Sequence, residues 1–199
     1  MSLETEVKIY LPDLDKIKAR LKASGAEQSK PRLFERNIRY ENATEDFSPR
    51  GIVLRLRQDD RVRLTYKEPP PAQESLTTIT RIELETEVSD FAAMDAILKR
   101  LGFHEFVVYE KFRTTYTLAN TEVVLDEMPY GNFIEVEGAP AAIEAAITQL
   151  GLNDHQRILA SYVDLFNVVK NALGLDFRDL SFANFEGIIV PDDLLTQPT

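Results

Sequence analysis

Charged and apolar residues alternate in the first segment of the chain, "LETEVKIYL". Glu4, Glu6 and Lys8 occupy every second position there. Residues two apart on a β-strand lie on the same face, roughly 7 Å apart, so a strand here would gather two carboxylates and an ammonium on one side. Carboxylates can bind a hard divalent cation, and an ammonium can bind an anion. This charged face is therefore either solvated or part of a binding site.

The same alternation recurs in period-two segments along the chain. The basic residues on these charged faces are Arg55, Arg57, Arg63, Lys67, Arg81, Lys111 and Arg113. The acidic residues are Glu83, Glu85, Glu87, Asp126, Glu135 and Glu137. An amphipathic sheet with its charged face in water explains any one of these segments. The whole set favours the lining of a cavity, because charges of both signs occupy nearly every position where Ser, Thr and Gln are usual.

The two signs of charge predict two ligands. Arginines bind phosphate through two hydrogen bonds and lysines bind it as point charges, so the basic residues predict a multivalent anion. The carboxylates would repel a phosphate directly, and their natural partner is a hard cation such as Mg²⁺ or Mn²⁺. We therefore expect a polyphosphate bound together with Mg²⁺ or Mn²⁺, and an uncharged metabolite does not fit.

The composition limits the other functions that are open. The chain has 199 residues, no cysteine and a formal net charge of -10, which predicts one domain without disulfides that repels nucleic acid and anionic membranes overall. His104 and His155 are isolated and make a poor zinc site. The N-terminal segment lacks a basic and apolar leader, and no run approaches 18 apolar residues. We therefore expect a soluble, cytoplasmic protein.

Helices and strands must place these charges on one face. Helical periodicity with matching ends predicts helices over residues 13–24, 89–102, 139–151 and 155–173. The alternating segments between them predict antiparallel strands, and eight strands are enough to close into a barrel with a charged interior. We therefore expect an α+β fold, a closed eight-stranded antiparallel β-barrel wrapped by amphipathic helices. It would span residues 1–173, with a C-terminal extension over 174–199 that packs on the barrel or frays.

An internal similarity supports this layout. The tetrapeptide "ETEV" occurs at residues 4–7 and again at 85–88. Each copy precedes an acidic helix cap, an amphipathic helix ending at glycine and several alternating strands. This order predicts two β-α-β-β-β halves related by a rough two-fold axis.

The order of the charged residues resembles that of the CYTH superfamily of triphosphate tunnel metalloenzymes. The motifs that carry the resemblance are Glu4-x-Glu6-x-Lys8, Arg55-x-Arg57, Lys67, "RIELETEV", Lys111-x-Arg113, Asp126 and Glu135-x-Glu137. The resemblance extends to about Phe166, and the second half of the chain is similar to the class IV adenylyl cyclase-like branch. It implies a barrel-shaped tunnel that binds a linear triphosphate with a divalent metal.

The resemblance also implies roles for individual residues. The phosphate-binding residues would be Lys8, Arg55, Arg57, Lys67, Lys111 and Arg113. The metal ligands would be Glu4, Glu6, Asp126, Glu135 and Glu137. Glu4, Glu6, Lys8 and Glu85 would be catalytic. Which of Glu83, Glu85 and Glu87 face the site stays open, because strand register is not fixed by the sequence.

Three functions are open to such a site. We rank metal-dependent hydrolysis of a triphosphate first, because water is always present and no base pocket is required. The second is class IV adenylyl cyclase activity, which converts ATP to cAMP and pyrophosphate, and the third is non-catalytic binding of polyphosphate. A thiamine triphosphatase is less favoured, since that branch commonly uses tryptophan and this chain has none. The expected partner is a small triphosphate, without nucleic acid or membrane, and a homodimer is left open.

Overall fold

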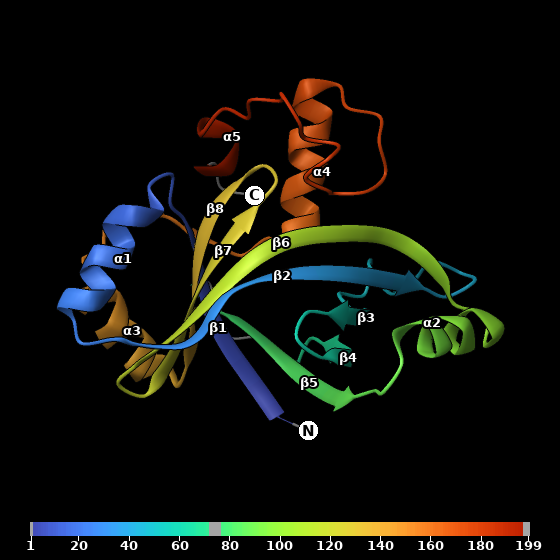
Figure 1. The fold of residues 1–199 in the computed structure, drawn as a ribbon, viewed down its shortest axis with the longest axis horizontal. Coiled ribbons are helices and arrows are strands. Elements are labelled where there is room, and N and C mark those ends of the chain that lie inside the picture. Colours follow the sequence, from blue (N-terminus) through green and yellow to red (C-terminus); the bar gives the residue numbers. More distant parts are fainter. Residues whose placement is uncertain (1, 72–76, 197–199) are drawn as a thin grey trace.

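The structure, a computed structural model, describes residues 2–71 and 77–196. Within these ranges, eight long antiparallel strands close into a barrel (Figure 1). They are β1 (Ser2–Tyr10), β2 (Glu27–Glu41), β3 (Val53–Gln58), β4 (Val62–Glu68), β5 (Ile79–Glu87), β6 (His104–Leu118), β7 (Thr121–Met128) and β8 (Gly131–Gly138). The order is β5-β4-β3-β2-β6-β7-β8-β1, and the pairing of β1 with β5 closes the circle. The predicted α+β barrel is confirmed.

Helices cover much of the outside of the barrel. They are α1 (Leu14–Ala23), α2 (Phe91–Arg100), α3 (Pro140–Gln149), α4 (Tyr162–Leu173) and the short α5 (Asp193–Thr196). The fourth helix was predicted to begin at residue 155, and this was wrong. Residues Arg157–Ile158 instead form a short strand, β9, beside β1, and Ser161 then caps α4 together with Asp164.

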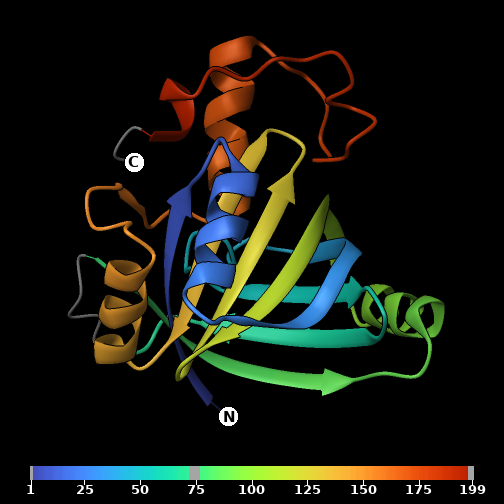
Figure 2. The ribbon, with the colours of Figure 1, turned by 60° about the vertical axis from the view of Figure 1, so that its left-hand side comes forward.

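The main apolar core lies between the barrel and its helices. Figure 2 shows α1 and α3 on the same side of the barrel. Leu21 of α1 and Ile147 of α3 pack with Val7, Val123 and other outward-facing strand residues, and the four named side chains are essentially inaccessible to solvent. Burial of each such aliphatic side chain stabilises the fold by about 1.5–3 kcal/mol. The alternate residues of the same strands must therefore point into the barrel.

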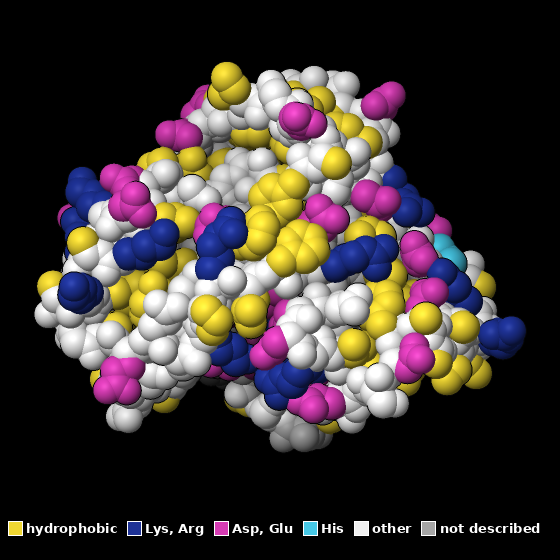
Figure 3. All heavy atoms as spheres, in the orientation of Figure 1, with side chains coloured by type: hydrophobic (Ala, Val, Ile, Leu, Met, Phe, Trp, Pro, Cys, Tyr) yellow, Lys and Arg dark blue, Asp and Glu magenta, His cyan; other side chains and the backbone are white. Residues whose placement is uncertain are grey.

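Part of the outer face of β2 and β6 is covered by aromatic side chains. Figure 3 shows hydrophobic side chains gathered over these strands. Phe34 contacts Phe112 with 5.3 Å between ring centroids, and Phe112 contacts Phe182 of the tail at 5.1 Å. The guanidinium of Arg32 lies 3.4 Å from the ring centroid of Phe112. Aromatic side chains and the guanidinium of Arg32 therefore cover this part of the outer face of the barrel.

The described part of the tail, residues 174–196, packs on the barrel. The backbone of Leu180 pairs with β6, because its N–H donates to Val108 and its carbonyl accepts from Glu110, both at 2.9 Å. Phe185 and Leu195 are buried in the cluster around α4. Residues 197–199 lie outside the described residues, and the domain boundary at residue 173 stays a prediction. Within the described part of the chain, no helix is long and apolar enough to cross a membrane.

The two halves of the chain repeat the order β-α-β-β-β. The repeated tetrapeptide is nevertheless not the equivalent position in the two halves. Glu4 precedes the α1 cap Asp13 by nine residues, whereas Glu85 precedes the α2 cap Asp90 by five. By this measure Arg81, nine residues before Asp90, is the counterpart of Glu4. The order of elements was predicted correctly, but the alignment that suggested it was shifted by four residues.

Candidate functional site

A cavity of about 520 Å³ lies inside the barrel. The basic side chains that line it are Lys8, Arg39, Arg55, Arg57, Arg63, Lys67, Arg81, Lys111 and Arg113. The acidic ones are Glu4, Glu6, Glu83, Glu85, Glu122, Glu135 and Glu137. Every residue predicted to bind phosphate therefore lines one cavity, and so do all the predicted metal ligands except Asp126. Side chains from strands far apart in the sequence meet here because the sheet closes on itself.

The structure separates the three glutamates of β5. Glu83 and Glu85 line the cavity. Glu87 lies two residues after Glu85, on the same face of β5. Its side chain is nevertheless 60% exposed and forms an ion pair with Arg61 outside the cavity. The strand continues past the end of the cavity, so lying on the inward face of the strand does not by itself place a residue in the site.

Asp126 is the centre of a buried set of ion pairs. Its Oδ1 accepts a hydrogen bond from Arg113 Nε at 2.7 Å, and its Oδ2 accepts from Lys111 Nζ at 2.9 Å and from the Tyr162 hydroxyl at 2.8 Å. Burial opposes ionisation, but Arg113 and Lys111 hold the pKa of Asp126 far below its usual range. Both oxygens are occupied, so Asp126 positions the two cations. A role as a metal ligand stays a prediction, and it would require these bonds to be exchanged.

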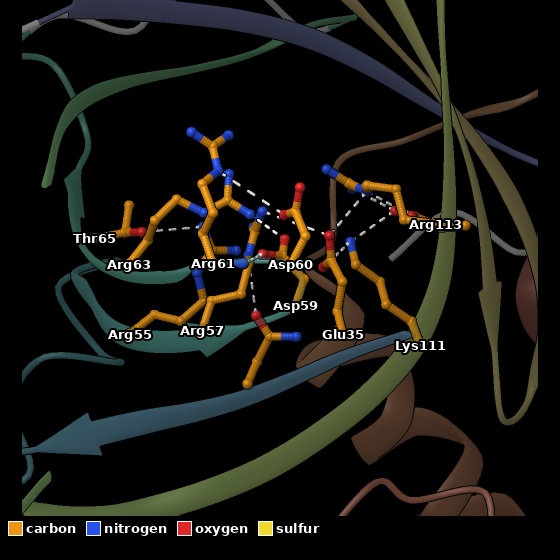
Figure 4. A network of polar contacts seen from close by, with 12 residues as sticks. Glu35, Arg55, Arg57, Asp59, Asp60, Arg61, Arg63, Thr65, Lys111 and Arg113 are labelled. Atoms are coloured by element: carbon orange, nitrogen blue, oxygen red, sulfur yellow. Dashed lines mark hydrogen bonds and ion pairs between the residues drawn. The ribbon is translucent and has the colours of Figure 1, made fainter. Parts of the chain in front are cut away.

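Glu35 is a second buried carboxylate of this set, and the sequence analysis missed it. It lies 3.6 Å from both Arg57 and Lys111 and 3.9 Å from Arg113. Burial opposes ionisation, but these cations lower the pKa of Glu35 to about 2. Figure 4 shows Glu35 with Lys111 and Arg113 on one side and the arginines of β3 on the other. We call Glu35, Arg57, Lys111, Arg113 and Asp126 the cation network.

Alternation along β2 could have identified Glu35. In "FERNIRYE", Glu35, Asn37 and Arg39 occupy every second position, and all three are buried polar residues. Asn37 Oδ1 accepts a hydrogen bond from Arg57 Nε at 3.2 Å. Arg36, Ile38 and Tyr40, the residues that alternate with them, face outward, so the period-two rule applied to the whole of β2 would have placed the other three side chains inside.

Carboxylates face one another elsewhere on the wall. Glu6 of β1 is directly opposite Glu137 of β8, which is directly opposite Glu122 of β7. We call these three residues the carboxylate row. Burial and the charge of Glu135 raise the pKa of Glu6 to about 7, and burial together with Glu4 and Glu122 raises the pKa of Glu137 to about 7. Like charges directly opposite one another on neighbouring strands are destabilising.

Ion pairs join the remaining acids to the cations. Lys67 pairs with Glu4 and with Glu83, the latter at 2.8 Å. Burial opposes ionisation, but hydrogen bonds from Glu83 and Lys67 lower the pKa of Glu4 to about 2. Lys8 lies 3.5 Å from Glu135. Along β1, these ion pairs lie on either side of Glu6.

The donor set fits Mg²⁺ or Mn²⁺ when phosphate oxygens complete the coordination. Among the residues that the structure describes, no three acidic or histidine side chains converge into a ready-made metal site. Mg²⁺ is commonly held by one or two carboxylates together with substrate phosphates and water, and does not need a cage of protein ligands. The raised pKa values of Glu6 and Glu137 mark oxygens whose mutual repulsion a cation would relieve. Glu6, Glu137, Glu4 and Glu135 are therefore the residues that could hold it.

The chain and its fold match known proteins. The sequence model of the CYTH domain matches residues 2–161. A Methanocaldococcus jannaschii protein, provisionally named an adenylate cyclase, is 31% identical over 169 residues, covering 84% of this chain and 90% of the relative. A Vibrio parahaemolyticus structure, also provisionally named an adenylate cyclase, has a TM-score of 0.72 at 17% identity, over 83% of this chain and 98% of that one. A Hippeastrum structure, provisionally named an adenylyl cyclase and described as having a dominant triphosphatase activity, has a TM-score of 0.61 at 18% identity, over 82% and 95% of the two chains.

Proposed function

The chain belongs to the CYTH domain family, and from this premise we propose that it hydrolyses a triphosphate with the help of Mg²⁺ or Mn²⁺. The observation that carries the proposal is that one cavity is lined both by the cations of the network, Arg57, Lys111 and Arg113, and by the carboxylate row. The cation network is complete before any ligand binds, whereas the carboxylate row is not compensated. A triphosphate with a divalent cation complements both sets.

The phosphate chain would bind to the basic side chains of the cavity, which are Lys8, Arg55, Arg57, Lys67, Lys111 and Arg113. Asp126 and Glu35 hold several of them in fixed positions. Cations fixed before substrate arrives stabilise charge that develops in the transition state without the cost of reorganisation. Phosphoryl transfer depends chiefly on this kind of positioning and charge stabilisation.

The carboxylates would have two tasks. Glu4, Glu6, Glu135 and Glu137 would hold the divalent cation, which supplies charge neutralisation at the phosphate oxygens and lowers the pKa of bound water. Glu85 accepts a hydrogen bond from Thr65 at 2.8 Å, and this bond and Arg57 lower its pKa although burial opposes ionisation. A carboxylate with a lowered pKa is a weak base, so Glu85 suits orientation of the attacking water better than removal of its proton.

The proposed reaction balances without another reactant. The oxygen of water forms a bond to the terminal phosphorus, and the bond from that phosphorus to the bridging oxygen breaks. The products are orthophosphate and the shortened phosphate chain, and the proton of the attacking water passes to solvent or a carboxylate. The Hippeastrum protein described by its triphosphatase activity supports this choice by analogy of fold.

Adenylyl cyclase activity is the second candidate. The names of the Methanocaldococcus and Vibrio relatives favour it. Val53, Ile79, Leu159 and Val163 also line the cavity, and their apolar side chains are surfaces that a nucleobase could contact. In this reaction the ribose 3′-oxygen would bond to the α-phosphorus while pyrophosphate leaves. The same basic residues would bind the triphosphate, so the site alone does not separate the two reactions.

Product identity separates them. Tripolyphosphate, thiamine triphosphate and ATP would each be incubated with the protein and Mg²⁺ or Mn²⁺, and products separated by ion chromatography. We expect orthophosphate from tripolyphosphate with the highest kcat/KM, and loss of this activity in Arg57→Ala, which controls for a contaminating phosphatase. Cyclic AMP with pyrophosphate from ATP would assign the cyclase instead. Tight binding of tripolyphosphate without metal and without turnover would assign the non-catalytic role.

A further inference from the structure

Arg39 is a buried cation of the cavity that the sequence analysis did not single out. It lies on β2, lines the cavity and is 9% exposed. Its guanidinium makes one long hydrogen bond, from Nη2 to Ser48 Oγ at 3.4 Å. Within residues 2–71 and 77–196, no carboxylate lies within ion-pair distance of it. Burial of such a cation without a partner is costly, and it lowers the pKa of Arg39.

The neighbouring acid on β2 cannot serve as its partner. Glu41 accepts hydrogen bonds from the backbone N–H groups of Phe47 and Ser48 at 3.1 and 2.8 Å, and from the Ser48 hydroxyl at 2.5 Å. These bonds hold the loop that follows β2. Glu41 does not line the cavity, so Arg39 is the last residue of β2 on the cavity wall.

The residue opposite Arg39 is another arginine. Arg39 of β2 pairs in register with Arg55 of β3, and both line the cavity. Arg55 donates hydrogen bonds to the hydroxyl groups of Tyr109 and Thr65, both at 3.3 Å, and lies 4.0 Å from Glu85. Burial opposes its charge, but Tyr109 and nearby carboxylates raise the pKa of Arg55. Like charges opposite each other on neighbouring strands repel. Arg55 is therefore partly compensated, whereas Arg39 is a buried cation for which the described residues supply no ion pair, opposite in sign to the carboxylate row.

We propose that Arg39 and Arg55 together form a phosphoryl-binding subsite at one end of the cavity, which makes the site selective for a triphosphate over a diphosphate. This inference rests on the proposed function, because it concerns the same ligand. Two planar guanidinium groups side by side can each donate two hydrogen bonds to phosphate oxygens, and an anion between them removes their repulsion. Arg39 lies four residues further along β2 than Glu35, the carboxylate that holds Lys111 and Arg57, so we expect a longer phosphate chain bound to those cations to reach it and a shorter one not to.

The test compares Arg39→Gln with wild type and with Arg36→Gln. Arg36 is the matched control, because it lies on the same strand and its guanidinium is 5.6 Å from the Phe91 ring centroid on the outer face. Calorimetry in EDTA would measure binding of tripolyphosphate and of pyrophosphate, and thermal unfolding would measure stability without ligand. A fourth protein, Arg39→Lys, keeps the charge but not the guanidinium fork.

We expect Arg39→Gln to weaken tripolyphosphate binding roughly ten- to hundredfold, the range for a lost charge-assisted hydrogen-bond pair. Pyrophosphate binding should change much less, and Arg39→Lys should recover part of the affinity. Without ligand, Arg39→Gln should unfold at the same or a higher temperature than wild type, because a repulsion is removed. A purely structural role for Arg39 predicts the opposite, a lower unfolding temperature with unchanged relative affinities.

Three results overturn the inference in distinguishable ways. If wild type binds tripolyphosphate and Arg39→Gln binds it equally well, or loses affinity for both phosphates equally, the subsite is wrong while the proposed function stands. If wild type binds neither phosphate in EDTA but hydrolyses tripolyphosphate with Mg²⁺, the subsite is wrong and the proposed function stands. If wild type neither binds nor hydrolyses tripolyphosphate with Mg²⁺ present, the proposed function fails and the subsite fails with it.

Discussion

The cation network lies on β2, β3, β6 and β7 and the carboxylate row on β7, β8 and β1, and the two regions differ in how their charges are compensated. In the network, Lys111 and Arg113 contact Asp126 and Glu35 at distances between 2.5 and 3.9 Å. In the row, Glu6 and Glu137 face each other across neighbouring strands, and the pKa of each is raised to about 7. The first region is stable without a ligand, and the second depends on protons or a cation.

This difference indicates how the site is prepared for substrate. A buried charge must be paired or compensated by a ligand, because desolvation is costly. The protein pairs its own charges where phosphate must be held in a fixed position. It leaves charges of one sign together where the ligand brings the opposite charge. Four predictions examine this contrast, in order of decreasing effect.

Asp126→Asn should have the largest effect on stability. The amide removes the charge that compensates Lys111 and Arg113, so the free energy of unfolding should fall by about 3–5 kcal/mol, as when one partner of a buried ion pair is lost. Urea unfolding measures this loss of unfolding free energy. Glu127→Gln, the next residue, removes only the exposed pair with Arg32 and should cost below about 1 kcal/mol. Equal losses in both variants would contradict the idea of a self-compensated network.

Glu6→Gln should separate activity from stability. We expect metal-dependent turnover of tripolyphosphate to fall about 100-fold with a much smaller change in KM, since the carboxylate serves chemistry more than phosphate binding. Without metal at pH 8 the variant should be at least as stable as wild type, because one repelling charge is gone. Steady-state kinetics measure kcat and KM, and thermal unfolding measures stability. The exposed Glu87→Gln variant is the control. Unchanged turnover in Glu6→Gln would remove β1 from the catalytic site.

The effect of Mg²⁺ should depend on pH. The pKa values of Glu6 and Glu137 are raised in the metal-free fold, so their protonated forms stabilise it below pH 4.5 and that contribution is lost as pH rises through about 7. A cation competes with these protons, so Mg²⁺ affinity and the Mg²⁺-induced rise in Tm should both increase from pH 6 to pH 8. Thermal unfolding with and without Mg²⁺ measures this. A rise in Tm that is constant across this range would show that the row does not bind the metal.

Tyr162→Phe should have the smallest effect. It removes the hydrogen bond to Asp126 but keeps the ring, which lies 4.3 Å from Lys8 Nζ. Arg113 and Lys111 still compensate Asp126, so we expect a loss of about 1 kcal/mol in unfolding free energy and a change in kcat of a fewfold. Urea unfolding measures the change in stability, and steady-state kinetics measure the change in kcat. A loss as large as that of Asp126→Asn would mean that the hydroxyl, and not the cations, stabilises the buried carboxylate.

Much of the barrel was predictable because strand periodicity is a local property. Alternation identified the cavity-facing side of β1, β3, β6 and β8, and the order of elements predicted the two halves of the fold. Local signals failed where one strand continues past the site, as with Glu87, and where a helix start depends on tertiary pairing, as with α4. Applied to the whole of β2, the same rule would also have found Glu35 and Arg39.

The sequence by itself determined which side chains share a face, because residues two apart on any strand point the same way. Only the tertiary structure decided which charges meet across strands. Asp126 binds Lys111 and Arg113 and Glu6 faces Glu137 because of the register between strands, and that register follows from long-range pairing and closure of the barrel. A one-residue change in register would leave every local pattern intact and exchange these partners.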